Sequence, residues 1–181
     1  TGAIIVTGEA AKKKNAEAIV ALFSAEAGKF VCATAGHNLE AILASYGSGA
    51  VHMTYHEGGD FTVMNVDVGG GTSKIAIVQG GKVIDTCAVE VGARLIAMDE
   101  AGKINRLEDT ALKVAKIAGI ANLTLGGAIS EEEKDKFSQV LCDSLFQVLE
   151  RKKLSPEVES LLLTPNLEYA VVMHDCSHQV A

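Results

Sequence analysis

The first third of the chain alternates between short apolar runs and segments with helical spacing. The runs at 3–6 and 30–35 have the length and composition of strands buried on both faces. Residues 10–27 repeat apolar positions on one helical face, and a second helix is expected at 39–47 with Asn38 as its N-cap. This β-α-β-α order predicts a parallel α/β layer.

The second of these helices has apolar residues at i, i+3, i+4 and i+7, a spacing that places them on one face. We expect this face to be buried and Gly47 to end the helix. The four apolar residues are Leu39, Ile42, Leu43 and Tyr46.

A change of pattern near residue 51 marks an expected boundary between two lobes. The stretch 52–60 is polar and contains two adjacent glycines, so the chain divides into residues 1–58 and 59–181. Three strand-like runs follow, and the short glycine turns between them are typical of antiparallel neighbours. The second lobe is therefore expected to begin as a β-meander, with strands at 61–68, 73–78 and 83–91.

The remaining pattern is mainly helical. Apolar residues at helical spacing predict helices at 108–118 and 131–152, and Ser130 with Glu133 forms a capping box before the second of them. A short helix at 157–163, a last strand at 169–173 and a tail at 174–181 complete the prediction.

The first turn of the β-meander has the composition of a phosphate-binding loop. Three consecutive glycines let the backbone approach an anion with its N–H groups turned inward, and hydroxyl groups add donors. A carboxylate directly before the loop suits Mg2+, which keeps several waters and takes few protein carboxylates. The expected cofactor-binding residues are Asp67, Gly69, Gly70, Gly71, Thr72 and Ser73, with Asp67 as the metal ligand.

Two widespread phosphate motifs are absent, the Gly-x-x-x-x-Gly-Lys-Ser/Thr loop and the Gly-x-Gly-x-x-Gly fingerprint. Both lead into helices, whereas this loop leads into an antiparallel strand. A plain hairpin turn is the alternative interpretation, and it is the one we adopt for the second glycine turn, Gly80-Gly81. The pair Gly126-Gly127 directly precedes the capping box and is interpreted as a loop into a helix.

Composition narrows the possible classes of function. The chain has 181 residues, of which 48% are hydrophobic, and a net charge of -7 that argues against a nucleic-acid partner. No apolar run has the length of a membrane span. The start at Thr1 has no signal-peptide pattern, so the chain reads as the middle of a longer protein. Four cysteines fit no metal or redox spacing and suit a reducing cytoplasm: Cys32, Cys87, Cys142 and Cys176.

Two resemblances go beyond composition. Residues 67–74 resemble the second phosphate motif of the actin, sugar-kinase and heat-shock-chaperone ATPase superfamily, and residues 39–47 resemble its connecting helix. A narrower resemblance, to the ethanolamine ammonia-lyase reactivating factors of the ethanolamine-utilization system, covers residues 1–100 and continues more weakly to residue 163. It rests on residues 2–12, 15–16, 33–36, 39–40, 47–50, 65–72 and 91–95.

The resemblance implies an α/β fold of the actin-like ATPase (ribonuclease H-like) type, incomplete here, with parts of two lobes and mixed sheets. Residues 1–58 would form the C-terminal part of the first lobe and 59–181 the second lobe with its phosphate-binding hairpin. The implied function is that of a chaperone-like factor that uses ATP and Mg2+. Its protein partner would be adenosylcobalamin-dependent ethanolamine ammonia-lyase, which it opens so that damaged cobalamin leaves.

Nucleotide state would set lobe closure in such a factor, and closure would set the affinity for the partner. The resemblance implies a weak ATPase in the cytoplasm, associated with a bacterial microcompartment. The first phosphate loop of the superfamily would precede residue 1, and no Gly-Gly adenosine motif follows residues 170–173. This chain alone is therefore expected to bind nucleotide poorly and to hydrolyse none.

The resemblance also implies that Glu9 and Glu40 face the cleft as catalytic residues that order water or magnesium. The alternative is that each lies in the first turn of a helix, where the macrodipole stabilises a carboxylate. Arg94 matches a family position whose role the sequence does not assign.

Two other functions stay open. A small-molecule kinase of the same superfamily would need a catalytic Asp in the cleft. A non-catalytic assembly module of a bacterial microcompartment would need no nucleotide. A metal site at residues 174–178 is a weaker interpretation than a polar tail, because no second ligand cluster accompanies its His, Asp and Cys residues.

Overall fold

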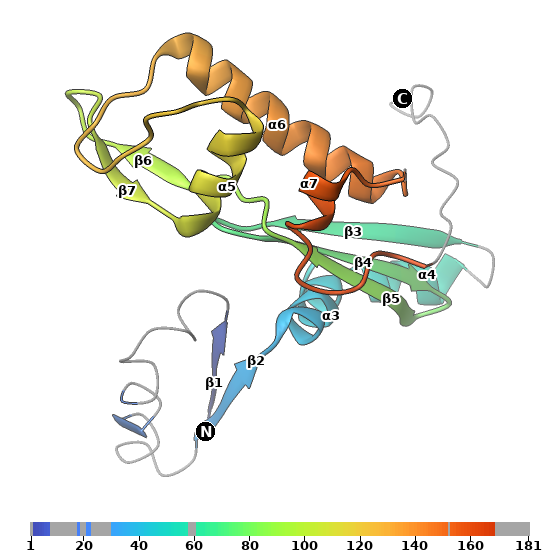
Figure 1. Cartoon of the computed structure of the whole chain (residues 1–181). Helices are drawn as coiled ribbons and strands as arrows, with labels where there is room; N and C mark the ends of the chain where they lie inside the picture. Colours follow the sequence, from blue (N-terminus) through green and yellow to red (C-terminus); the bar gives the residue numbers. More distant parts are fainter. Residues whose placement is uncertain are drawn as a thin grey trace, which may run out of the picture.

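A three-stranded antiparallel sheet with helices on both faces lies at the centre of the molecule (Figure 1). The computed structural model describes residues 2–7, 18, 21–22, 30–57, 61–151 and 153–168. The fold is of the mixed α/β kind, with one parallel strand pair and two antiparallel sheets among the described residues. Its element order is β1, β2, α3, α4, β3, β4, β5, β6, β7, α5, α6 and α7.

The first strand pair confirms the two predicted N-terminal strands. β1 (Gly2–Thr7) and β2 (Phe30–Ala35) run parallel, as expected for two strands joined by a long connection. Of the helix predicted between them, only residues 18, 21 and 22 are described, and they are helical. The rest of that prediction lies outside the described residues.

The central sheet confirms the predicted β-meander. It consists of β3 (Thr62–Val68), β4 (Ser73–Gln79) and β5 (Lys82–Val89), with β4 in the middle. Alternate residues of β4 pack on opposite faces of the sheet, so the whole strand apart from its last residue is buried. Ile75 and Ile77 join the core under the later helices, whereas Val78 packs with Ala50 and Val51 of the helix before the sheet.

Helix α3 (His37–Gly47) ends at the predicted glycine but differs from the prediction in two ways. Its N-cap is Gly36, so the prediction of Asn38 as N-cap was wrong. The prediction that the apolar face is buried was also wrong. The residues buried against the sheet are Ala41 and Ser45. Tyr46 is 61% exposed, and Leu39 and Leu43 are each about 40% exposed. Small side chains on the inner face let the helix lie close to β4 and β5.

Helix α4 (Ala50–Glu57) occupies the polar stretch where we expected a boundary and no helix. Its buried Thr54 hydroxyl donates to the Val51 carbonyl and accepts the Gly81 N–H, both at 3.1 Å, which ties the helix to the β4–β5 turn. Helices α3 and α4 both pack against the central sheet. The division into residues 1–58 and 59–181 stays a prediction.

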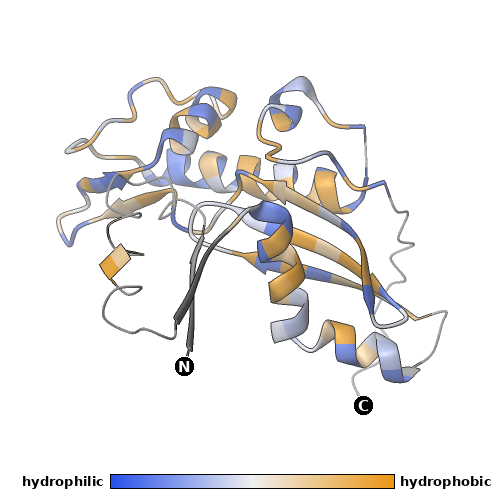
Figure 2. Ribbon diagram, turned by 90° about the horizontal axis from the view of Figure 1, so that it is seen from below, coloured by the Kyte–Doolittle hydropathy of each residue, from blue (hydrophilic) through white to orange (hydrophobic). Residues whose placement is uncertain are grey.

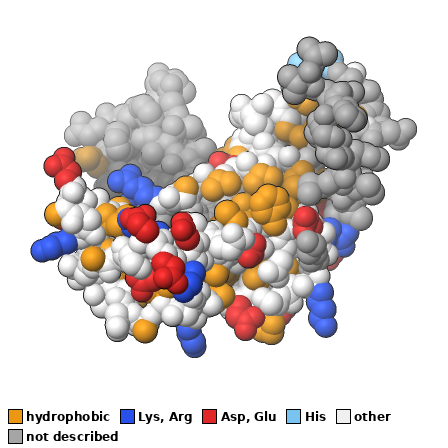
Figure 3. All heavy atoms as spheres, turned by 90° about the horizontal axis from the view of Figure 1, so that it is seen from above, with side chains coloured by type: hydrophobic (Ala, Val, Ile, Leu, Met, Phe, Trp, Pro, Cys, Tyr) orange, Lys and Arg blue, Asp and Glu red, His pale blue; other side chains and the backbone are white. Residues whose placement is uncertain are grey.

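The other face of the sheet is covered by α6 (Glu131–Leu149) and α7 (Pro156–Glu159), both shorter than predicted. The capping box is confirmed, because the Ser130 hydroxyl accepts from the Glu133 N–H and the Glu133 carboxylate accepts from the Ser130 N–H. Figure 2 shows hydrophobic residues in the central strands and on the helices that pack against them. The face in Figure 3 carries acidic and basic side chains close together, with hydrophobic side chains gathered beside them.

A second core cluster lies beside the sheet, around helix α5 (Asp109–Ile117) and a small hairpin. The hairpin strands, β6 (Ile96–Met98) and β7 (Ile104–Leu107), were not predicted. They are too short to carry a period-2 signal. The buried members of this cluster are Leu95, Ile104, Ala111, Val114, Ala115, Ile120, Leu123, Ile129 and Phe137.

Residues 161–164, here called the edge segment, lie along the free edge of β5. The Leu163 N–H donates to the Ala88 carbonyl at 2.9 Å, and the Ala88 N–H donates to the Thr164 hydroxyl at 2.8 Å. Val89 and Leu162 form an isolated antiparallel bridge. The segment thus satisfies backbone groups that an edge strand would leave unpaired.

The predicted strand at 169–173 and the residues of the tail lie outside the described residues. Among the helices that are described, none is both long and apolar enough to cross a membrane.

Candidate functional site

The glycine loop, residues 69–72, joins β3 to β4 and is held by a second turn. The Gly69 N–H closes the loop on the Thr72 carbonyl at 3.0 Å. The Ala93 and Arg94 N–H groups donate to the carbonyls of Gly69 and Gly70 at 2.9 and 2.8 Å. Within the described part of the chain, the N–H groups of Gly70 and Gly71 donate to no acceptor, so they are available to an anion or to water.

The glycines of this region are needed for different reasons. A Cβ on Gly92 would lie 2.5 Å from the Gly70 oxygen and from the Gly71 carbonyl carbon, so the two turns can meet only if residue 92 is glycine. A Cβ on Gly70 would lie no closer than 3.7 Å to the Arg94 Cβ, and Gly70 does not have a positive φ. The fold therefore has no steric need for glycine at position 70, whereas an open backbone there lets a ligand approach.

The two hydroxyl residues after the glycines differ in their availability. Ser73 is fully buried, and its hydroxyl donates to the Val91 carbonyl at 2.7 Å. Because a serine hydroxyl has only one hydrogen, Ser73 braces the loop and has no donor left for a phosphate in this conformation. The Thr72 hydroxyl oxygen accepts from the Lys74 ammonium at 2.5 Å, which leaves its own hydrogen free to donate.

Lys74 and Glu40 form an ion pair beneath the loop. The Lys74 Nζ lies 2.7 Å from Glu40 Oε2, and the two side chains are only 9% and 10% exposed. Glu40 lies in the first turn of α3, so the pair links that helix to the glycine loop. Lys74 is the last residue of the stretch 67–74 that resembles a phosphate motif, but the sequence assigns it no role of its own. It is also the only charged residue in β4.

Asp67 is exposed near the end of β3, directly opposite Lys74 in the sheet register. It borders a hollow of about 330 Å3 together with Asn65, Val66 and residues of α3 and its C-cap. The described residues hold no group of three or more His, Cys, Asp or Glu side chains suited to a metal. A single exposed carboxylate still fits Mg2+, which keeps most of its waters. The other predicted carboxylate, Glu9, lies outside the described residues.

A small hollow of about 150 Å3 borders the loop at Gly71 and Thr72. Its walls include three acidic residues, Glu90, Glu108 and Asp109. Two of them have cationic partners, since Glu90 is paired with Lys113 and Glu108 with Arg106. The walls of this hollow therefore carry no excess of positive charge, and an anion bound in it needs a cation from elsewhere.

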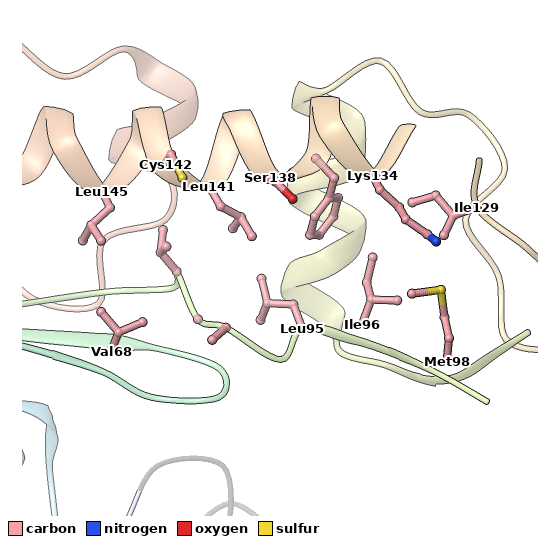
Figure 4. A pocket seen from close by; sticks show the side chains of 14 residues that line it. Val68, Leu95, Ile96, Met98, Ile129, Lys134, Ser138, Leu141, Cys142 and Leu145 are labelled. Carbon is pink, nitrogen blue, oxygen red and sulfur yellow. The ribbon is translucent and has the colours of Figure 1, made fainter. Parts of the chain in front are cut away.

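An apolar pocket of about 430 Å3 lies on the α6 side of the loop (Figure 4). Leu141, Leu145 and Ser138 of α6 extend toward Leu95, Ile96 and Val68. The pocket was not predicted, because its walls come from segments far apart in the sequence. The segment with Gly126 and Gly127 is a turn before α6, as expected, and is fixed by the Gly126 N–H donating to the Ile104 carbonyl at 2.8 Å.

Comparison with known proteins agrees with the narrower resemblance. Residues 1–178 match the model of the family described as "Ethanolamine utilisation protein EutA". The chain is 34% identical over 165 residues to the ethanolamine ammonia-lyase reactivase EutA of Salmonella typhimurium, covering 91% of this chain and 34% of that protein. It is 42% identical over 104 residues to the reactivase of the same name from Escherichia coli, covering 58% of this chain and 22% of that protein.

The chain thus spans about a third or less of the length of these relatives. Its family match covers nearly every residue, from the first strand to beyond the last described element. The glycine loop and the ion pair beneath it both lie within the matched range. This chain belongs to the EutA family of ethanolamine utilisation proteins.

Proposed function

We propose that this chain is part of an ATP-dependent reactivating factor for ethanolamine ammonia-lyase. Two relatives named as reactivases of that enzyme support the proposal. In this proposal the factor works in the cytoplasm, alongside the ethanolamine microcompartment. It opens the inactivated enzyme so that damaged cobalamin leaves, and its own ATP hydrolysis is slow.

The observation that carries the nucleotide part of the proposal is the open backbone at Gly70 and Gly71. Two adjacent N–H groups without acceptors among the described residues fit an anion, and at Gly70 the fold does not require glycine. The Thr72 hydroxyl adds a donor. In our proposal these groups hold a phosphate of ATP, Ser73 keeps the loop in place, and Asp67 orders the waters of Mg2+.

The proposed architecture is one lobe of an actin-like ATPase around the central sheet. Support comes from an antiparallel meander covered by helices on both faces, with the glycine loop between its first two strands. Glu40 is proposed to order water or magnesium once it is released from Lys74, and Glu9 to act beside it. Bound ATP would supply the free energy for lobe closure; the chain's own groups hold and orient it.

Calorimetric titration of the full-length protein with Mg-ATP tests the nucleotide site. We expect Asp67→Ala to weaken binding markedly and the exposed α6 variant Asp135→Ala to leave it unchanged. If the folded wild-type protein binds no Mg-ATP, the loop is a plain turn and the nucleotide proposal is wrong.

Recovery of enzyme activity tests the reactivase part of the proposal. Ethanolamine ammonia-lyase carrying inactive cobalamin should regain activity with the full-length protein, ATP, Mg2+ and fresh cofactor. Recovery without ATP would point to a non-catalytic assembly role. Phosphorylation of a small substrate without any recovery would point to a kinase.

A further inference from the structure

The ion pair between Lys74 and Glu40 is an unexpected feature for the interior of this fold. Both side chains are about nine-tenths buried, and Lys74 interrupts the most apolar strand of the sheet. Taking two charges out of water is costly, and a buried pair is often no more stabilising than apolar residues of the same volume. Stability alone is therefore a weak reason for a lysine at this position.

The position of the ammonium indicates what it is for. It donates to the Thr72 hydroxyl, so it lies at the glycine loop itself, and it has a third hydrogen beyond the two donated to Thr72 and Glu40. The same loop holds three further donors with no acceptor among the described residues, namely the Thr72 hydroxyl and the N–H groups of Gly70 and Gly71. Lys74 thus adds a positive charge to a loop that already has open hydrogen-bond donors.

Among the described residues, the other cations near the loop are less suited to binding a phosphate. Lys113 and Arg106 already pair with the acidic residues of the small hollow. Arg94 is exposed, so the charge of its side chain is largely screened by water. A buried ammonium interacts far more strongly with an anion than an exposed one does.

We propose that Lys74 is a phosphate-binding residue of the glycine loop and that Glu40 competes with the phosphate for it. Without a ligand, Glu40 neutralises the ammonium. A phosphate group bound at the loop takes over Lys74 and breaks its ion pair with Glu40, which changes how α3 is attached to the sheet. This inference rests on the proposed nucleotide site and adds a residue and a partner exchange to it.

Two single variants separate this role from a structural one because they act in opposite directions. In the full-length protein, we expect Lys74→Met to weaken binding of metal-free ATP by about tenfold to a hundredfold, the loss of one charge-assisted hydrogen bond. We expect Glu40→Gln to strengthen it by about tenfold, because the competing carboxylate is gone. ATP without metal is used because Glu40 then cannot affect ATP binding through magnesium. Lys82→Met, an exposed lysine at the far end of the sheet, is the matched control and should bind as wild type does.

The double variant Glu40→Gln/Lys74→Met is the control for folding, because it removes both charges of this ion pair together. It should fold and bind as weakly as Lys74→Met. If both single variants weaken binding equally, or if the folded double variant binds as wild type does, the inference is wrong while the nucleotide site stands. If wild type binds neither Mg-ATP nor metal-free ATP, the nucleotide site and this inference are both wrong.

Discussion

At the scale of single residues, the site depends on which glycines the fold requires. Gly92 is required, because any Cβ there would collide with the backbone of the loop. Glycine is not required at position 70, because there is room for a side chain and the residue does not have a positive φ. The first kind of glycine keeps two turns in contact, and the second keeps a surface open.

Gly92→Ala should destabilise the protein by about 1–3 kcal/mol, because the backbone of Gly70 and Gly71 has to move away from the new Cβ. It should also weaken Mg-ATP binding through the displaced loop. Urea unfolding measures the first effect and calorimetry the second. Gly47→Ala, where nothing lies within 4 Å, is the control and should be neutral or slightly stabilising. Equal stability of wild type and Gly92→Ala would contradict the close approach of the two turns.

The sequence predicted the loop residues but not the groups that hold them. Three glycines after Asp67 are a local signal and could be recognised directly. Gly92 and the Val91 carbonyl act on the loop from about twenty residues away, and Lys74 is paired with Glu40 of a helix that precedes the sheet. Such roles depend on tertiary packing, which a single sequence does not reveal.

At the scale of elements, most helices and strands followed from periodicity, and the exceptions have physical causes. The prediction of the buried face of α3 was wrong because small side chains of this helix, rather than its large apolar ones, face the sheet. Helix α4 was not predicted because its sequence is polar and gives no helical pattern. The helix is fixed to the β4–β5 turn by the buried Thr54, a contact that the sequence does not reveal. The meander and α6 were predicted correctly because their turns and cap carry specific residues.

Ser130→Ala should destabilise the protein by about 1 kcal/mol, since α6 loses the acceptor for the Glu133 N–H. The Ser130 N–H, and then its hydroxyl, lower the pKa of Glu133 below its ordinary value of 4.5. A lowered pKa in the folded state means that the carboxylate stabilises the fold above pH 4.5 and loses this effect as the pH falls through the folded value.

The pH dependence is tested by urea unfolding of Glu133→Ala beside wild type. The difference in stability should be largest at neutral pH and should shrink steadily in acid. Glu100→Ala, an exposed residue between β6 and β7, is the control and should show little difference at any pH. A difference for Glu133→Ala that stays constant down to low pH would contradict the charged cap.

At the scale of the whole molecule, α6 connects two cores. Its Leu141 packs against both the cluster under the central sheet and the cluster around α5 and the small hairpin. The edge segment also belongs to the first of these cores, because its fully buried Leu161 packs in the cluster under the central sheet. The sheet is therefore completed by residues distant in sequence from its strands.

Leu161→Ala should lower the free energy of unfolding by about 2–5 kcal/mol, because a fully buried side chain is removed and leaves a cavity. The matched control is Leu112→Ala on α5, where the side chain is 48% exposed and the expected change is within about 0.5 kcal/mol. Urea unfolding followed by circular dichroism compares the two. Similar losses for both variants would mean that the edge segment does not belong to the core.

The edge segment also has a consequence for how the protein is made. Ala88 and Thr164, which are hydrogen-bonded in the folded chain, are 76 residues apart. At a synthesis rate of about 5–20 residues per second, β5 leaves the ribosome about 4–15 seconds before the edge segment that pairs with it. During that interval the sheet has an open edge that a neighbouring nascent chain can pair with. The yield of folded protein therefore depends on keeping that strand away from other chains until translation has passed residue 164.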